Sequence, residues 1–473
     1  MDSRGLSSSQ RSTASTEVDP MMPRTPKRFS LWPAVWLASS RGNSRTLAAQ
    51  RTHSCQWQEA EAPAMSAAER VLHERVPLLR LVGITMFCMA FGTCTSVFPL
   101  FLFAKEAAIL FPDHASVGLG CLCGVAGLAH LAVPIAGRLS DTTFTRLGRR
   151  QPFILVGSMV CLVGLILMGT ASYLRSAQLY LPAVLVGMIG LNTAQAAENG
   201  LVPDFVSASQ AGQASGVVAL QHFAGSIVGF STIAVLALFP HADYRLMYVF
   251  VMAELVICVV ITVMSASERC YDENQLRSVS IQELLTAFYQ PLLDPDFFWV
   301  WLSRTIYYFA VSAHVFLFYF VRDVVVRESQ NNQELQFGIM ALLAQFSAAL
   351  IAFPAGQLSQ LQWVGRKLLI YIAGALLVAS YFSFLQTPMW STPYRRIAFL
   401  YFVSLLYGIG NGLYVGVDYA IALDCLPCRE AAAQYLGTWS IGSFLGGTIG
   451  PLLGGMMLHF SGRSMSRWFK DGD

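Results

Sequence analysis

Long apolar runs separated by short polar loops dominate the chain from residue 76 onward. A helix needs roughly 20 apolar residues to cross about 30 Å of hydrocarbon. Lipid cannot hydrogen-bond open backbone groups, so each such run is expected to form a helix. We therefore predict an all-α integral membrane protein. Its eleven predicted spans are residues 80–104, 116–137, 152–173, 179–200, 211–239, 246–266, 297–320, 336–358, 367–386, 394–418 and 431–459.

The spans and the polar segments divide the chain into five parts. These are a tail (1–75), a first bundle of six spans (76–266), a cytosolic inter-bundle loop (267–296), a second bundle of five spans (297–460) and a polar C-terminal tail (461–473). Residues 21–57 hold six basic residues and no acidic one. A disordered basic cytosolic tail and an organellar transit peptide both have this composition. Asp2, Glu17 and Asp19 favour the cytosolic tail.

Composition agrees with a membrane protein and excludes several function classes. The 473 residues are 55% hydrophobic and 12% charged, whereas soluble domains carry about 25% charged residues. A net charge of +3 is too small to indicate a nucleic-acid partner. The sequence has no GxxxxGK[ST] nucleotide-binding loop and no HExxH or GxSxG motif. We therefore expect neither an ATP-driven pump nor an enzyme, and no cofactor.

The distribution of basic residues predicts which side the N-terminus faces. Lysine and arginine are enriched in cytosolic loops. With the tail inside, the inner loops hold nine basic residues and the outer loops seven, and the tail adds ten more. The N-terminus is therefore predicted to be cytosolic.

The two bundles resemble each other in sequence. Matched positions are Gly137 with Gly356, Glu198 with Asp418, Asp204 with Asp424, Gln213 with Gln434 and Gly216 with Gly437, at offsets of 219 to 221 residues. This repeat predicts two bundles related by an axis along the membrane normal. It also places a twelfth span at about 466–486, so the second bundle is expected to lack its last helix, with the C-terminus outside.

One loop resembles a known family. Residues 137–150, GRLSDTTFTRLGRR, resemble the loop between the second and third helices of the major facilitator superfamily. Residues 146–154 and 200–216 are similar to its sucrose and glycoside–cation symporter branch. The resemblance covers nearly all of the apolar part of the chain. It implies a monomeric carrier that moves a sugar with protons by alternating access. The second-half loop departs from the pattern, with Gln360 where the first has Asp141.

Charged residues at the inner ends of spans are candidates for a cytosolic gate. Opposite charges attract strongly in the low dielectric near a membrane face, so such pairs can form on closing and break on opening. Asp141 is expected to pair with basic residues or a helix N-terminus of the other bundle. Ordinary charges in a solvated rim are the alternative, and the repeat favours the gate. The gate candidates are Asp141, Arg149, Arg150 and Glu198 in the first bundle, and Arg366, Lys367 and Asp418 in the second.

Polar side chains within spans are candidates for substrate binding or coupling, because ionisable groups in membranes are rare. Arg304 could donate to a sugar hydroxyl or pair with an acid, or its side chain could reach toward the cytosol. The amide of Asn192 suits a hydroxyl-rich substrate, and Tyr307 offers a stacking face. These candidates are Arg304, Asn192, His222, His130, Glu254 and Tyr307.

Three of these candidates titrate and are therefore candidates for proton coupling. His130 and His222 could relay protons, although lone histidines in packed helices are more often hydrogen-bonded core residues. Burial favours the protonated form of a carboxyl such as Glu254, which suits coupling. Glu254 could instead pair with another helix or hold its proton permanently.

We therefore predict a sugar or glycoside–proton symporter driven by a proton gradient. Two other functions stay open. One is an exporter or antiporter of another small organic solute. The other is a membrane receptor or scaffold that keeps a carrier fold without transporting.

Overall fold

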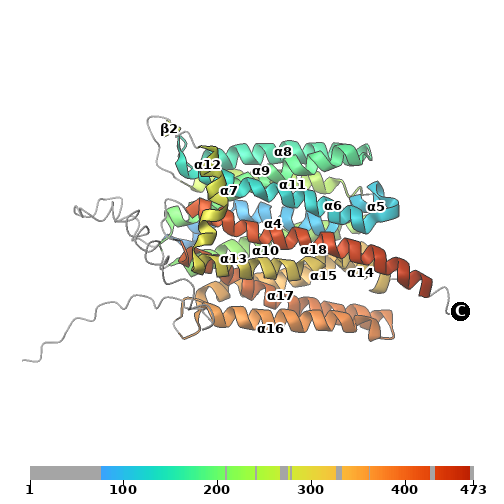
Figure 1. The fold of residues 1–473 in the computed structure, drawn as a ribbon. Helices are drawn as coiled ribbons and strands as arrows, with labels where there is room; N and C mark the ends of the chain where they lie inside the picture. Colours follow the sequence, from blue (N-terminus) through green and yellow to red (C-terminus); the bar gives the residue numbers. More distant parts are fainter. Residues whose placement is uncertain are drawn as a thin grey trace, which may run out of the picture. The chain divides into compact units, whose positions relative to one another are not determined.

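The computed structural model describes residues 76–207, 210–239, 242–266, 275–276, 280–325, 333–361, 363–426 and 432–468. Long helices from both halves of the chain lie side by side (Figure 1). The first half contains α3 (Leu78–Ile84), α4 (Phe87–Val97), η2 (Phe98–Leu102), α5 (Phe103–Leu110), η3 (Pro112–His114), α6 (Ala115–Leu128), η4 (Ala129–Leu131), α7 (Ala132–Thr142), β1 (Thr143–Phe144), α8 (Gln151–Tyr173), α9 (Ala177–Phe205), α10 (Ala211–Ala237) and α11 (Leu246–Ser265).

The second half follows a short connecting segment. It contains β2 (Gln275–Leu276), α12 (Ile281–Tyr289), η6 (Gln290–Leu293), α13 (Pro295–Val311), η7 (Ser312–Phe316), α14 (Leu317–Phe320), η8 (Val321–Val325), α15 (Gln333–Leu358), α16 (Gly365–Gln386), η9 (Thr387–Met389), α17 (Pro393–Asp424) and α18 (Ala432–Trp468). Strand β2 pairs antiparallel with β1, which ties the connecting segment to the loop after α7. Helix α12 packs against α7 and α18.

The all-α membrane fold predicted from the apolar runs is confirmed. Ten helical stretches of the described chain are long and apolar enough to cross a membrane. They match ten of the eleven predicted spans. The remaining one, 297–320, is helical but divided into α13, η7 and α14.

The first membrane segment of each half is interrupted. In the first half, α4 passes into the π-helix η2, where Pro99 lies in the first turn. Proline has no N–H to donate to the preceding turn, which disturbs regular α-helical hydrogen bonding. In the second half, the 3-10 helix η7 and the π-helix η8 interrupt the corresponding segment. The breaks therefore recur in both halves.

The two interfaces between the halves repeat the same close contact. A Cβ atom added to Gly137 on α7 would lie 2.5 Å from the carbonyl oxygen of Ala433 on α18. One added to Gly356 on α15 would lie 2.5 Å from the carbonyl oxygen of Gly212 on α10. The two pairs are related by the offsets of the sequence repeat, since Gly137 matches Gly356 and Gly212 matches Ala433. Only glycine allows these helices to approach so closely.

We predict that Gly356→Ala destabilises the protein, because the added methyl group would overlap the α10 backbone. Overpacking of this kind costs about 1–3 kcal/mol. Thermal unfolding in detergent should show a lower melting temperature. Gly374→Ala is the matched control, since an added Cβ on this α16 residue meets nothing within 4 Å. Equal melting temperatures for the two variants would contradict the prediction.

Candidate functional site

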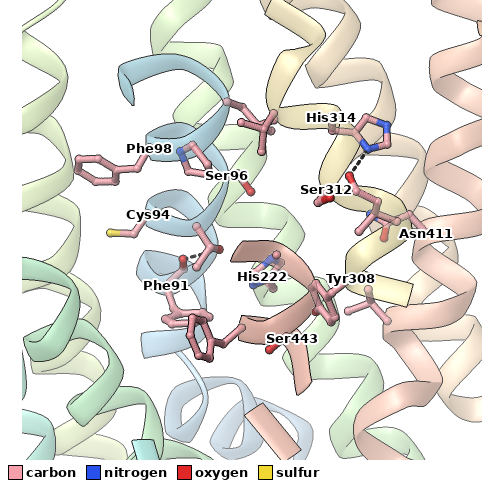
Figure 2. Close-up of a pocket in the computed structure, with 18 of the residues that line it drawn as sticks. Phe91, Cys94, Ser96, Phe98, His222, Tyr308, Ser312, His314, Asn411 and Ser443 are labelled. Carbon is pink, nitrogen blue, oxygen red and sulfur yellow. Dashed lines mark hydrogen bonds between the residues drawn. The ribbon is translucent and has the colours of Figure 1, made fainter. Parts of the chain in front are cut away.

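A cavity of about 400 Å³ lies between the two halves. Its described lining comes mainly from α4, α6, α9 and α10 in the first half and from α13, α15, α17 and α18 in the second. Figure 2 shows side chains of both halves around this space, with Phe91 and His222 from the first and Tyr308, His314 and Asn411 from the second. The space between the halves is where a two-bundle carrier would hold its substrate.

The halves touch each other at both ends of this cavity. At the end that carries Arg149, Arg150 and Arg366, which we call the basic end, Tyr419 donates a hydrogen bond from its hydroxyl to the carbonyl of Asn199 at 2.9 Å. Ser215 likewise donates to the carbonyl of Gly416 at 2.9 Å.

The opposite end, which we call the far end, is also closed by contacts between the halves. Tyr319 donates to the carbonyl of Ala104 at 3.2 Å, and Lys105 pairs with Glu334. The rings of Phe101 and Phe318 meet edge to face with centroids 6.1 Å apart. Because the halves are in contact at both ends of the cavity, we refer to this arrangement as occluded.

A buried charge network closes the basic end on the side of the first half. Arg150 is fully buried and pairs with Asp141 at 2.6 Å and with Asp204 at 3.0 Å. Arg149 also pairs with Asp204. Burial lowers the pKa of the Arg150 guanidinium, but Asp141 and Asp204 outweigh this effect and raise it above its ordinary value. The arginine therefore stays charged and holds the ends of α7 and α9 together.

Asp141 also connects the two halves. Its Oδ2 atom accepts a hydrogen bond from the backbone N–H of Gln434 at 3.1 Å, in the first turn of α18. The N-terminus of a helix carries unpaired N–H groups and a partial positive charge, which favour a carboxylate there. The expected contact between Asp141 and a helix N-terminus of the other half is therefore present.

In the second half, the corresponding arginine pairs with the corresponding aspartate. Arg366 forms an ion pair with Asp424 and donates to the carbonyl of Ala420 at 2.5 Å. Asp424 is the repeat partner of Asp204, so the two arrangements are related by the repeat. Lys367 follows Arg366 in the first turn of α16, and its side chain is exposed.

The acidic partners at the basic end therefore differ from those expected. Glu198 and Asp418 were paired with these basic residues in the sequence analysis, whereas the described ion pairs use Asp204 and Asp424. The reason is helix geometry, because six residues at 1.5 Å each place Glu198 and Asp418 about 9 Å deeper along α9 and α17. The gating role of the basic-end pairs stays a prediction.

Asp418 instead pairs with Arg304 at the cavity wall. Both side chains are more than nine-tenths buried, and Arg304 lies over the ring of Trp439 at 3.4 Å from its centroid. Tyr308 adds a second ring at 4.7 Å and accepts a hydrogen bond from Arg304 at 3.4 Å. The sequence left two positions open for the Arg304 side chain, one at the substrate site and one toward the cytosol. The structure places it at the cavity wall.

Five of the six residues proposed for substrate binding or coupling line the cavity. These are Arg304, Asn192, His222, His130 and Tyr307. Tyr307 stacks on Tyr414 with centroids 3.5 Å apart and donates to Asn411. The amide of Asn192 donates to the carbonyl of Met188 in its own helix, which leaves its oxygen available. The ring of His130 stacks on Phe444.

Glu254 lies away from the cavity. It sits on α11, accepts a hydrogen bond from the hydroxyl of Thr93 on α4 at 2.8 Å, and is not among the lining residues. Helix α11 contributes no described residue to the lining. A coupling role for Glu254 would therefore have to act through α4.

An aromatic cluster around His314 was missed by the sequence analysis. The ring of His314 lies 4.1 Å from that of Tyr407, and its Nδ1 atom lies 2.8 Å from the carbonyl of Val311 and 3.1 Å from the hydroxyl of Tyr381. Trp439 was missed as well. A histidine among aromatic residues in an apolar run looks like core packing, so no signal in the sequence indicated a role for it.

Comparison with known proteins identifies the family to which this chain belongs. The sequence matches the family model of the Major Facilitator Superfamily in two overlapping stretches, residues 29–230 and 81–433. The chain belongs to this superfamily. The Major Facilitator Superfamily consists of multi-pass membrane transporters for small molecules, which agrees with the predicted membrane spans and with transport.

Two solved structures of the Major Facilitator Superfamily share the fold. The crystal structure of the human organic anion transporter MFSD10 (TETRAN) is 18% identical, with a TM-score of 0.59 over 84% of this chain and 95% of that one. The nucleoside transporter NupG is 15% identical, with a TM-score of 0.54 over 81% and 90%. A search of curated proteins finds no match. The narrower sucrose and glycoside–cation branch stays a prediction.

We predict that breaking the Arg304–Asp418 pair strongly destabilises the fold. Arg304→Gln or Asp418→Asn alone would leave an unpaired buried charge, which costs about 3–5 kcal/mol. The double variant removes both charges and should recover most of the loss. Thermal unfolding of the four proteins measures this coupling, and additive losses in the double variant would contradict it.

We also predict that Asp141→Asn opens the basic end more often, because it weakens the pair with Arg150 and the contact with α18. The readout is labelling of Cys123, which lines the cavity, by a membrane-impermeant maleimide in a variant that retains no other cysteine. Labelling from the basic-end side should be several-fold faster. Asp113→Asn, at an exposed residue of η3, is the control and should leave the rate unchanged.

Proposed function

We propose that the chain is a secondary active transporter that carries a sugar or glycoside together with protons by alternating access. One observation carries the proposal. Among the described residues, five that line the cavity each have a buried polar atom without a protein hydrogen-bond partner. The atoms are Nδ1 of His130, Oε1 of Gln195, Nε of Arg304, Nε2 of His314 and Nε1 of Trp439.

These atoms form a set that a hydroxyl-rich molecule can satisfy. A buried polar atom without a partner costs about 1–3 kcal/mol, and a ligand that supplies the partner recovers this energy. Arg304 and Trp439 present N–H donors, and Gln195 presents an acceptor. His314 can accept at Nε2 if its Nδ1–H donates to Val311. A hydroxyl group can both donate and accept, so the hydroxyls of a sugar suit donors and acceptors alike.

The charge of the cavity also favours a neutral substrate. Arg304 is paired with Asp418, so its charge is already compensated in the occluded state. An organic anion would have to compete with that buried carboxylate for the guanidinium. The rings of Trp439, Tyr308 and Tyr407 add flat apolar faces against which the C–H face of a sugar ring can pack. The volume of about 400 Å³ lies within the range of small-molecule sites.

Orientation and energy source complete the proposal. The basic end faces the cytosol in this scheme, because arginine-rich loops stay on that side. An inward proton gradient drives uptake. The substrate binds between the halves. The contacts at one end of the cavity then break while those at the other end hold, so that the cavity opens to one side of the membrane at a time.

Uptake into proteoliposomes tests this function. Labelled sucrose, maltose and glucose are each offered under an inward proton gradient, and at least one should accumulate and be lost again when a protonophore is added. Arg304→Gln combined with Asp418→Asn, which leaves no unpaired buried charge, should abolish the flux, whereas Arg395→Ala, at an exposed residue on α17, should not. Size-exclusion chromatography verifies that both variants fold.

The panel also includes uridine and an organic anion, because the two similar structures are described as a nucleoside and an organic anion transporter. Accumulation of either of these with none of the sugars would overturn the sugar proposal and favour another solute. Sugar binding without counterflow would indicate a receptor.

A further inference from the structure

Glu198 is a buried carboxyl beside the cavity with no ion-pair partner among the described residues. Its residue is 1% exposed, and its neighbours Gln195 and Asn199 on α9 line the cavity. The thiol of Cys88 donates to both carboxylate oxygens, at 3.1 and 3.2 Å, and the amide of Gln195 donates to one of them at 3.3 Å. A thiol is a weaker donor than a guanidinium, so these bonds stabilise a negative charge less than an arginine would.

The sequence repeat shows what is missing at this carboxyl. Asp418 occupies the matching position in the second half, where Arg304 neutralises it. At the same offset of 220 residues, the position of Arg304 corresponds to Ile84 and that of Tyr308 to Cys88. The first half therefore keeps the acid of the repeat without the base. A lone charge in so dry a place is unfavourable, so the carboxyl needs a cation.

We propose that Glu198 is the site at which the coupling proton binds. This proposal rests on the proton coupling included in the proposed function, and it assigns that coupling to one residue. A proton fits better than a metal ion, because a proton needs only the carboxylate oxygen to which it binds, whereas a metal cation needs several ligands. No group of three or more His, Cys, Asp or Glu side chains that could hold a metal is found among the described residues.

The groups that face Glu198 do not supply another counter-charge. Cys88 on α4 donates to the carboxylate, and Tyr419 on α17 donates to the carbonyl of the next residue, Asn199. Toward the basic end, Arg150 pairs with Asp141 and Asp204. His130, on η4, stacks on Phe444.

The position of Glu198 links its proton to the closure of the basic end. The next residue, Asn199, accepts the hydrogen bond from Tyr419 that joins α9 to α17 of the other half. While this contact is closed, water is kept from the carboxyl and the protonated form is favoured. When the basic end opens, water solvates the carboxylate, so the O–H bond breaks and the proton passes to water. In the next cycle, a proton that enters from the far end restores the O–H bond.

Infrared difference spectroscopy tests the site without any substrate. Purified protein in liposomes is titrated from acid to alkaline pH, and the carbonyl stretch of a protonated carboxylic acid is followed. The wild-type band should disappear as pH rises, and Glu198→Gln should lack the titrating component. Glu254→Gln, at a buried carboxyl of the same half outside the cavity, is the matched control and should keep it. A titrating band that survives in Glu198→Gln, or is lost in Glu254→Gln instead, overturns the proposal.

A second variant keeps the test decisive if Glu198→Gln does not fold. Cys88→Ala leaves the carboxyl in place but removes a donor to its charged form, so the band should persist to more alkaline pH. An unchanged titration in Cys88→Ala would contradict the assignment.

Transport then separates this inference from the proposed function. With the sugar that wild-type protein accumulates, Glu198→Gln should lose proton-driven accumulation but keep counterflow, in which no proton has to leave. Accumulation by Glu198→Gln, or accumulation by the wild type that follows a sodium gradient instead, overturns the proposal. If wild-type protein carries no sugar, the proposed function fails, while the infrared titration still decides whether Glu198 binds the proton.

Discussion

A charge in the dry interior of this protein is stable only next to an opposite charge or in a neutral form, and the placement of functional groups follows from that constraint. Burying an ion without a partner costs several kcal/mol even after the surroundings relax. Arg150 is fully buried because Asp141 and Asp204 surround it. Arg304 faces the cavity because Asp418 lies against it. Each pair also joins two helices, so charge compensation and helix packing are the same contact.

The repeat distributes these pairs over two levels. At the basic end, Asp204 and Asp424 neutralise arginines of their own halves near the membrane face. About 9 Å deeper, water has less access, and the two acids of the repeat diverge in their surroundings. Asp418 has the guanidinium of Arg304 beside it, whereas Glu198 has the thiol of Cys88. The structural duplication thus leaves the halves similar in shape but different in electrostatics.

Much of the fold could be predicted from the sequence, because lipid imposes long apolar runs and the duplication repeats them. The contact of Asp141 with the other half was also within reach, since helix N-termini attract carboxylates. The depth of each acid along its helix was harder to predict. Glu198 and Asp204 both lie at the end of one apolar run, and only the rise of the helix between them separates their depths. The aromatic cluster around His314 could not be found, since tyrosine in a membrane span is usually packing. Five of the six polar candidates line the cavity because polar side chains in membrane spans face the interior of the bundle or a cavity and not the lipid.

The breaks in the first membrane segment of each half bear on how the two entrances open. Helices α10 and α17, which pack together across the halves, have no proline in their interiors. In the proposed cycle they would part at the basic end as rigid elements. Near the far end, the π-helix η2 follows α4 and the π-helix η8 follows α14, and π-helical turns are sites where helices bend. In the proposed cycle, the far end would open by bending at these two sites. The two entrances would then differ in stiffness, and residues near Pro99 and η8 would affect one of them alone.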